Sequence, residues 1–208
     1  TSEYDRVITR YLDEDSKNKT VLFDSFTSIE LEKDTALRYG ENPHQDAALY
    51  NISSPILDNF DFSKLSGKEL SYNNLVDVDC AHSCVQQFSN PACVIVKHAN
   101  PCGVAESSSI EIAYRKSFNC DPISSFGGII AVNRRLTISL IAKILNKQFV
   151  EVIVAPSVDK ACLDILKKKP NVRLLVIKNT KKRIKSYEIK SIKNKILIQT
   201  SDNKDITK

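Results

Sequence analysis

Four short apolar runs constrain the fold of this chain more than any other feature. They cover residues 92–96, 129–132, 150–154 and 172–177, and only a glutamate and an arginine interrupt them. Apolar residues recur at helical spacing in the segments 75–88, 109–118, 137–147 and 159–168. Near-continuous apolar runs indicate strands buried on both faces, and strands that alternate with helices indicate crossover connections. The sequence therefore predicts an α/β fold, a mostly parallel sheet with helices on both faces.

The two ends of the chain are less regular. We expect a short helix around residues 4–12, a polar linker over 13–20 and a strand within 21–31. Gly, Pro and polar residues predict loops at 37–50 and 67–74. The lysine-rich segment 178–195 indicates a surface connection, and 196–199 indicates one more strand.

The net charge of +5 belongs to the last part of the chain. From Lys178 to Lys208 there are ten Lys/Arg and three Asp/Glu, a net of +7, so the remainder carries −2. Only Tyr187 places an aromatic ring among these basic residues. A negative body without interleaved basic and aromatic residues argues against a nucleic-acid partner.

Composition also bears on location. No apolar run approaches the roughly 18 residues of a membrane-spanning helix, and the first residues lack the pattern of a secretory signal. Six cysteines, at 80, 84, 93, 102, 120 and 162, lie mostly in apolar or helical segments. This favours reduced thiols and a cytoplasmic location. The chain has no methionine, even at position 1, so we expect a piece of a longer protein or a processed product.

Lys97 and His98 directly follow the apolar run 92–96 and precede residues 100–103, whose Pro and Gly predict a turn. If 92–96 is an interior parallel strand, the pair lies at the edge where α/β sheets bind ligands. Lysine supplies a cation, and histidine supplies a group that titrates near neutral pH. The pair can therefore move a proton and hold a developing negative charge. The alternative is a charged strand end exposed to water.

Two further segments carry groups suited to ligand binding. Residues 38–45 gather a guanidinium, a phenol, an amide and an imidazole around one glycine, and the arginine suits a phosphate or a carboxamide. The alternative is a polar surface loop. Residues 121–128 offer hydroxyls and backbone N–H groups before a strand. Neither a G-x-G-x-x-G nor a Walker A pattern is present, which removes the dinucleotide and P-loop interpretations.

Metal binding is disfavoured. On a helix, Cys80 and Cys84 share a face while His82 points elsewhere. A deaminase-type zinc site needs a second cysteine three residues after Cys102 and a glutamate two residues after His98, and the chain has neither. We therefore expect no metal.

Four motifs in order resemble one family. They are Arg38-Tyr39-Gly40-Glu41-Asn42-Pro43-His44-Gln45, Lys68-Glu69-Leu70-Ser71-Tyr72-Asn73-Asn74, Lys97-His98-Ala99-Asn100-Pro101-Cys102-Gly103 and Asp121-Pro122-Ile123-Ser124-Ser125-Phe126-Gly127-Gly128. Together they are similar to the bifunctional purine biosynthesis enzymes, which join a formyltransferase domain to an inosine monophosphate (IMP) cyclohydrolase domain. The resemblance implies that 1–20 is a linker and the end of the cyclohydrolase domain, 21–200 the first, cytidine-deaminase-like lobe of the transformylase domain, and 201–208 a tail.

The resemblance also implies a reaction. The family transfers a formyl group from 10-formyltetrahydrofolate to 5-aminoimidazole-4-carboxamide ribonucleotide (AICAR) in purine biosynthesis. By position, His98 would be the base, and Lys97 would stabilise the oxyanion or the departing folate nitrogen. The residues implied to contact substrate are Arg38, Tyr39, Asn74, Ser124, Ser125, Phe126 and Gly127.

Partners follow from the same resemblance. We expect small-molecule substrates, no membrane, and a homodimer with sites at the subunit interface in the full-length parent. Because the second transformylase lobe is absent from the chain, we expect residues 1–208 alone to be inactive. Two alternatives stay open: a folded fragment that only binds nucleotide, and a nucleic-acid-binding module that acts through the basic tail.

Overall fold

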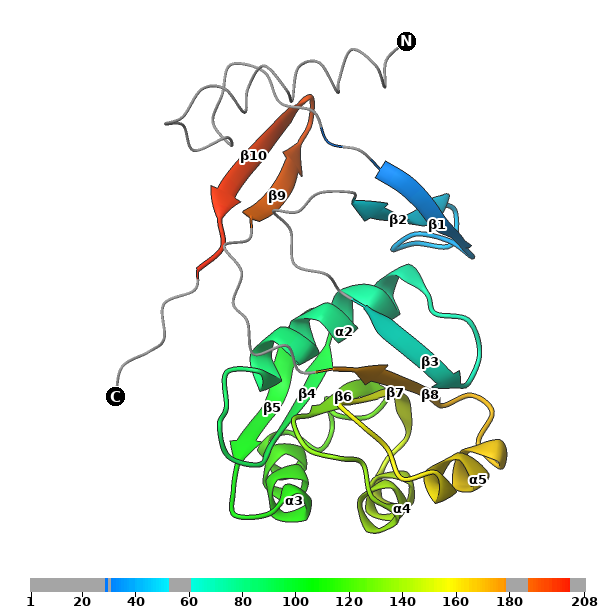
Figure 1. The fold of residues 1–208 in the computed structure, drawn as a ribbon, viewed down its shortest axis with the longest axis vertical. Helices are drawn as coiled ribbons and strands as arrows, with labels where there is room; N and C mark the ends of the chain where they lie inside the picture. The colour runs from blue at the N-terminus through cyan, green and yellow to red at the C-terminus, as the bar shows by residue number, and fades with distance from the viewer. Residues whose placement is uncertain (1–28, 30, 53–60, 179–186, 203–208) are drawn as a thin grey trace, which may run out of the picture.

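The structure, a computed structural model, describes residues 29, 31–52, 61–178 and 187–202 (Figure 1). The helix expected at 4–12, the linker at 13–20 and nearly all of the strand expected at 21–31 lie outside the described residues. The described elements are β1 (Leu31–Leu37), β2 (Ala47–Ile52), β3 (Phe62–Ser66), α2 (Tyr72–Val85), β4 (Ala92–Lys97), β5 (Asn100–Glu106), α3 (Ile110–Cys120), β6 (Gly128–Val132), α4 (Ile138–Lys147), β7 (Val150–Ala155), α5 (Ala161–Lys167), β8 (Arg173–Ile177), β9 (Tyr187–Ile192) and β10 (Lys195–Thr200).

One six-stranded sheet organises the molecule, with the strand order β3-β8-β7-β6-β4-β5 (Figure 1). Helix α2 covers one face of this sheet, and α3, α4 and α5 cover the other. The predicted α/β class with helices on both faces is therefore confirmed. The sheet is mixed: β6, β7 and β8 run parallel, whereas β3 is antiparallel to β8.

The strand predicted at 92–96 is an interior strand, but the expectation that it runs parallel to its neighbours is wrong. β4 pairs antiparallel with both β5 and β6. The cause is a strand that sequence reasoning missed, since β5 follows β4 after only two residues, and so short a connection joins only antiparallel strands. Helix α3 then crosses over β4, so that β5 and β6 run in the same direction on either side of it.

The sheet interior explains the continuous apolar run. Cys93 and Ile95 belong to the apolar cluster beneath α3, α4 and α5, whereas Val94 and Val96 belong to the cluster beneath α2. All four side chains are fully buried. Successive strand residues point to opposite faces, and both faces of this sheet are covered, so every position of β4 from Ala92 to Val96 must be apolar.

Side-chain caps set the helix starts. Helix α2 begins at Tyr72, three residues before the predicted start, because Ser71 and Asn74 form a reciprocal capping box. Ser109 caps α3 and Thr137 caps α4 through hydroxyl groups that accept backbone N–H bonds. Within the described residues, no helix is both long enough and apolar enough to cross a membrane.

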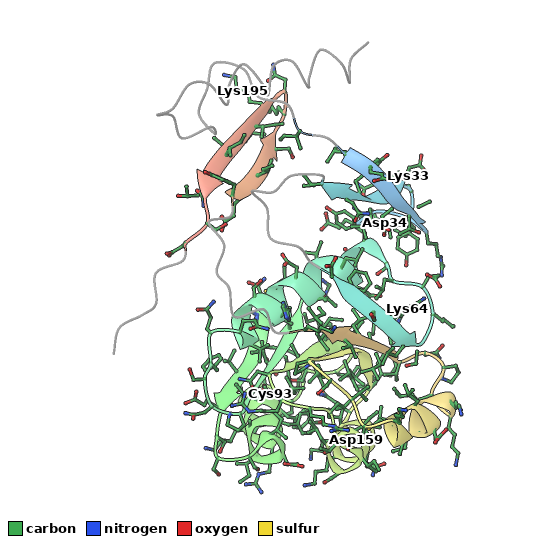
Figure 2. The ribbon with its side chains drawn as sticks, in the orientation of Figure 1. Lys33, Asp34, Lys64, Cys93, Asp159 and Lys195 are labelled. Atoms are coloured by element: carbon green, nitrogen blue, oxygen red, sulfur yellow. The ribbon has the colours of Figure 1, made fainter. Side chains whose placement is uncertain are left out.

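Two hairpins stand on the α2 side of the sheet in Figure 1. Strands β1 and β2 pair antiparallel, so only residues 38–46 of the loop expected at 37–50 are a connection. Strands β9 and β10 form the other hairpin; β10 confirms the strand expected at 196–199, and β9 occupies part of the connection expected at 178–195. In Figure 2 the side chains of Lys33 and Lys195, on these hairpins, lie apart from the packed body that holds Cys93.

Candidate functional site

The turn between β4 and β5 carries the most unusual backbone of the described chain. His98 and Ala99 form it, with φ angles of 54° and 55°. A two-residue hairpin loop of this kind needs positive φ at both positions and normally uses Asn-Gly. A residue with a Cβ in this conformation costs roughly 1–2 kcal/mol. The expectation of a turn at 100–103 is wrong, since Asn100 already begins β5.

Helix α2 holds this turn in place. The Ala99 N–H donates to Asp77 Oδ1 at 2.6 Å, and the Cys80 thiol donates to the Ala99 carbonyl at 3.3 Å. The Asn100 side-chain amide donates to the His98 carbonyl at 3.0 Å. Both polar backbone groups of Ala99 are thus bonded to α2, and the His98 side chain is left exposed at the edge of the sheet. Sequence analysis missed Asp77, because helical spacing alone does not show what packs against that face.

Lys97 is anchored on another loop. Its ammonium group donates to the Phe126 carbonyl at 2.9 Å. Gly127 follows with a φ of 75°, a conformation that glycine adopts without strain, and the Gly128 N–H bonds back to the Ser125 carbonyl. The structure therefore brings Lys97 together with the segment 121–128, as the sequence motifs implied.

The segment 121–128 is an ordered turn. Asp121 Oδ1 accepts from the N–H groups of Ile123 and Ser124 at 3.1 and 2.9 Å, and hydrogen bonds led by Ser124 lower the pKa of this carboxyl. Ser125 is buried and its hydroxyl donates to the Asp121 carbonyl at 2.7 Å. Ser125 therefore shapes the loop, while Phe126 remains 61% exposed.

The Phe126 ring faces a groove. Its centroid lies 5.6 Å from that of Phe149, and both rings line a groove of about 630 Å³. Lys147, Lys168 and Lys169 line the same groove. The groove is therefore lined by both aromatic and basic side chains.

The loop of residues 38–46 lies against the start of α2. The Asn73 side-chain amide donates to the Glu41 carbonyl at 3.2 Å, and the Gly40 N–H donates to the Gln45 carbonyl at 2.7 Å. The Arg38 guanidinium carbon lies 5.1 Å from the centre of the Tyr39 ring, a cation–π distance. Among the described residues, neither Arg38 nor Tyr39 forms a hydrogen bond or an ion pair with Lys97 or His98.

Asn74 lies on helix α2, and its side chain is buried. Its Oδ1 accepts from the Ser71 N–H at 3.3 Å, and its Nδ2 donates to Glu151 Oε2 at 2.9 Å. Glu151 lies near the start of β7, and it is the glutamate that interrupts the apolar run 150–154. A glutamate within an apolar strand is a sequence signal that its carboxylate has a polar partner, but the sequence does not identify that partner as Asn74.

One face of α2 joins these parts. Asn73, Asp77 and Cys80 follow each other at the i, i+4, i+7 spacing of a helix face, and they contact the 38–46 loop and the His98–Ala99 turn in that order. Lys97 ends β4 at the edge of the sheet where β6 and β7 begin. The site therefore lies at the amino edge of the parallel strands, and the expected location at their carboxyl edge is wrong because β4 is antiparallel.

The cysteines and His82 take no part in a metal centre within the described segments. There, no group of three His, Cys, Asp or Glu residues has a metal-binding arrangement. All six cysteines are free thiols. Burial lowers the pKa of His82, and burial is also the main cause that raises the pKa values of Cys80, Cys84 and Cys102.

Comparison with known proteins gives one consistent result. The family model described as "AICARFT/IMPCHase bienzyme" matches residues 1–208. The chain is 44% identical over 213 residues to "Bifunctional purine biosynthesis protein PurH" of Buchnera aphidicola subsp. Schizaphis graminum (strain Sg), 46% identical over 211 residues to the protein of that name from Xylella fastidiosa (strain 9a5c), and 43% identical over 206 residues to that of Petrotoga mobilis (strain DSM 10674 / SJ95). Each match covers 99% of this chain but 40% of the relative, so the chain spans about two fifths of their length.

Proposed function

Because the chain belongs to the AICARFT/IMPCHase bienzyme family, we propose that it supplies part of a formyltransferase active site. The reaction is transfer of the formyl group of 10-formyltetrahydrofolate to the 5-amino group of AICAR, and the complete protein also carries IMP cyclohydrolase activity. The observation that carries the proposal is the exposed His98 on a strained turn, next to Lys97. Because the family model matches the whole chain, we also assign residues 21–200 to the first lobe of the transformylase domain.

His98 acts as the general base. The 5-amino group of AICAR is a weak nucleophile, because its lone pair is delocalised into the ring and the carboxamide. A base must therefore take its proton as the bond to the formyl carbon forms. General acid–base catalysis of this kind contributes about 10²–10⁴-fold.

Lys97 stabilises negative charge. One of its three N–H donors is used on the Phe126 carbonyl, which fixes the ammonium group, and the other two have no hydrogen-bond partner among the described residues and are available for the reacting oxygen. A fixed donor aimed at a developing oxyanion contributes about 10²–10³-fold. The same cation can instead stabilise the departing folate nitrogen.

The remaining predicted residues bind the substrates. Arg38 suits the nucleotide phosphate, because its guanidinium is exposed and forms no ion pair within the described residues. Tyr39 supports Arg38 through the cation–π contact. The exposed Phe126 ring and the basic groove beside it suit a flat heteroaromatic ring that carries carboxylates. Asn74, Ser124, Ser125 and Gly127 shape the walls around these groups.

Formyl transfer by the full-length protein tests the function. His98→Ala should abolish turnover while the affinity for AICAR stays within about tenfold, since a base acts on the transition state more than on ground-state binding. His82→Gln is a matched control, because His82 lies on α2 and contacts Gln86 rather than the turn. Near-normal turnover of His98→Ala would show that the proposed base is wrong.

A second candidate is nucleotide binding without catalysis. It concerns residues 1–208 by themselves, which span 40% of the relatives' length, whereas the family match favours the complete reaction. Calorimetric binding of AICAR to residues 1–208, without formyl transfer by the same chain, would support it. We further propose that the complete protein works in the cytoplasm as a homodimer, which fractionation and sedimentation equilibrium can test.

A further inference from the structure

We propose that Asp77 is a positioning residue for His98, which it holds in its reactive place by anchoring the Ala99 backbone. The inference rests on the proposed formyltransferase function. Asp77 itself touches no reacting atom. It acts through one hydrogen bond, the 2.6 Å bond from the Ala99 N–H to Asp77 Oδ1.

The conformation of the turn needs such an anchor. His98 and Ala99 both have positive φ, and neither is a glycine. Residues with a Cβ avoid this region, so a free His-Ala turn would move to other conformations. The surrounding structure must therefore impose the observed one, and the bonds to Ala99 and the Asn100–His98 bond are the contacts that do so.

The anchor is rigid. Asp77 lies on α2 between Asn74 and Val78, two residues that are 4% and 0% exposed and fix that part of the helix against the sheet. The thiol of Cys80, one turn further along, is bonded to the carbonyl of the same Ala99. A carboxylate oxygen is a strong acceptor for a backbone N–H, and the second bond fixes the orientation of the peptide.

The placement of the turn matters because a general base works only within hydrogen-bond reach of its proton. The His98 imidazole is exposed, so its position depends mainly on the backbone that carries it. A shift of about 1 Å can cost about 10²-fold in rate. Removing Asp77 should therefore lower kcat and leave KM for AICAR nearly unchanged.

Steady-state kinetics of the full-length protein test this inference with four variants. Asp77→Ala should lower kcat by about ten- to a hundredfold. Asp77→Asn keeps an acceptor oxygen in the same place and should retain most of kcat. Asp79→Ala is the matched control, since Asp79 is an exposed aspartate on the same helix with no hydrogen bond to the turn among the described residues. Ala99→Gly combined with Asp77→Ala should recover activity, because glycine adopts positive φ without an anchor.

A measurement on the 208-residue chain separates this inference from the proposed function. Amide hydrogen exchange at Ala99 should be at least about tenfold faster in Asp77→Ala than in the parent chain, and unchanged in Asp79→Ala. Unchanged exchange would overturn the inference whatever the enzyme does. Loss of kcat in Asp77→Asn equal to that in Asp77→Ala would also overturn it, since the carboxylate would then act by its charge. If Ala99→Gly did not restore the activity of Asp77→Ala, the inference would also be overturned, because Asp77 would then act on folding in general and not on this turn.

Discussion

Cys93 lies in the middle of β4, and its thiol is fully buried between the sheet and α3. Burial raises its pKa from the usual value of 9.0 to about 12, and a hydrogen bond with Ser117 opposes part of that rise. The unfolded chain loses this proton near pH 9, whereas the folded chain keeps it until about pH 12. The contribution of Cys93 to stability is therefore complete below pH 9 and is lost as the pH rises from there to about 12.

The first prediction follows from the upward shift of the Cys93 pKa. The free energy of unfolding should fall above pH 9, with Cys93 contributing up to about 1.4 kcal/mol per pH unit. Urea titrations of the chain at a series of pH values measure it. Cys93→Ala should show a shallower fall, while Cys120→Ala should keep the parent slope, since Cys120 is exposed. Equal slopes in all three proteins would contradict the burial argument.

Gly103 gives the second prediction at the residue scale. A Cβ built on it would lie 2.0 Å from the Ser117 carbonyl oxygen, a backbone atom that cannot move aside without shifting α3. Gly103→Ala should lower the free energy of unfolding by about 1–3 kcal/mol. Gly40→Ala is the comparison, because its Cβ would lie 3.0 Å from the Gln45 Cβ, a contact that a small shift within the 38–46 loop relieves. A Gly103→Ala chain as stable as the parent would show that β5 and α3 are less closely packed.

At the element scale, the buried apolar strands were predictable, whereas the edge strand β5 and the direction of β4 were not. The apolar run 92–96 follows from burial on both faces, a local consequence of side-chain chemistry. The antiparallel pairing of β4 depends on β5, whose polar start and Pro101 hide a strand. Proline is tolerated there because β5 is an edge strand. The proposed site residues Lys97 and His98 could be identified from the sequence because they belong to a motif, whereas Asp77 could be identified only from its contact with the turn.

Asn133 provides a prediction about how elements are joined. Its side chain is buried at the end of β6; Oδ1 accepts from the Ala92 N–H at 2.8 Å, and Nδ2 donates to the Phe88 and Asn90 carbonyls at 2.9 and 2.8 Å. It therefore ties the connection between α2 and β4 to the sheet.

Asn133→Ala removes three hydrogen bonds and should cost about 2–4 kcal/mol of the free energy of unfolding. Asn133→Asp should cost at least as much at pH 7, because a carboxylate would face two carbonyl oxygens, and part of its stability should return at acid pH. Urea unfolding at pH 7 and pH 4 measures both effects. Equal stability of the aspartate variant and the parent at pH 7 would exclude the bonding pattern.

At the scale of the whole molecule, the proposed site is open to solvent on one side within the described residues. His98 is exposed and Phe126 is 61% exposed, although both belong to the set proposed to surround the reacting atoms. Ile123, in the same segment as Phe126, is 88% exposed. Large apolar side chains exposed around functional groups are typical of a surface that another part of a protein covers. The chain spans 40% of the length of its relatives, which leaves room for such a part.

The last prediction is that residues 1–208 alone transfer no formyl groups. The chain offers the proposed base, the proposed oxyanion-binding lysine and the loop proposed to bind the nucleotide, but within the described residues no second wall is present to hold two substrates in contact. Positioning of reactants accounts for about 7–11 kcal/mol of a barrier, so an open site should lose measurable turnover. The purified chain and the full-length protein should be compared with both substrates at saturating concentrations. Turnover of the chain within a factor of about ten of the full-length protein would mean that these residues form a self-sufficient site, because that loss is only about 1.4 kcal/mol of the barrier.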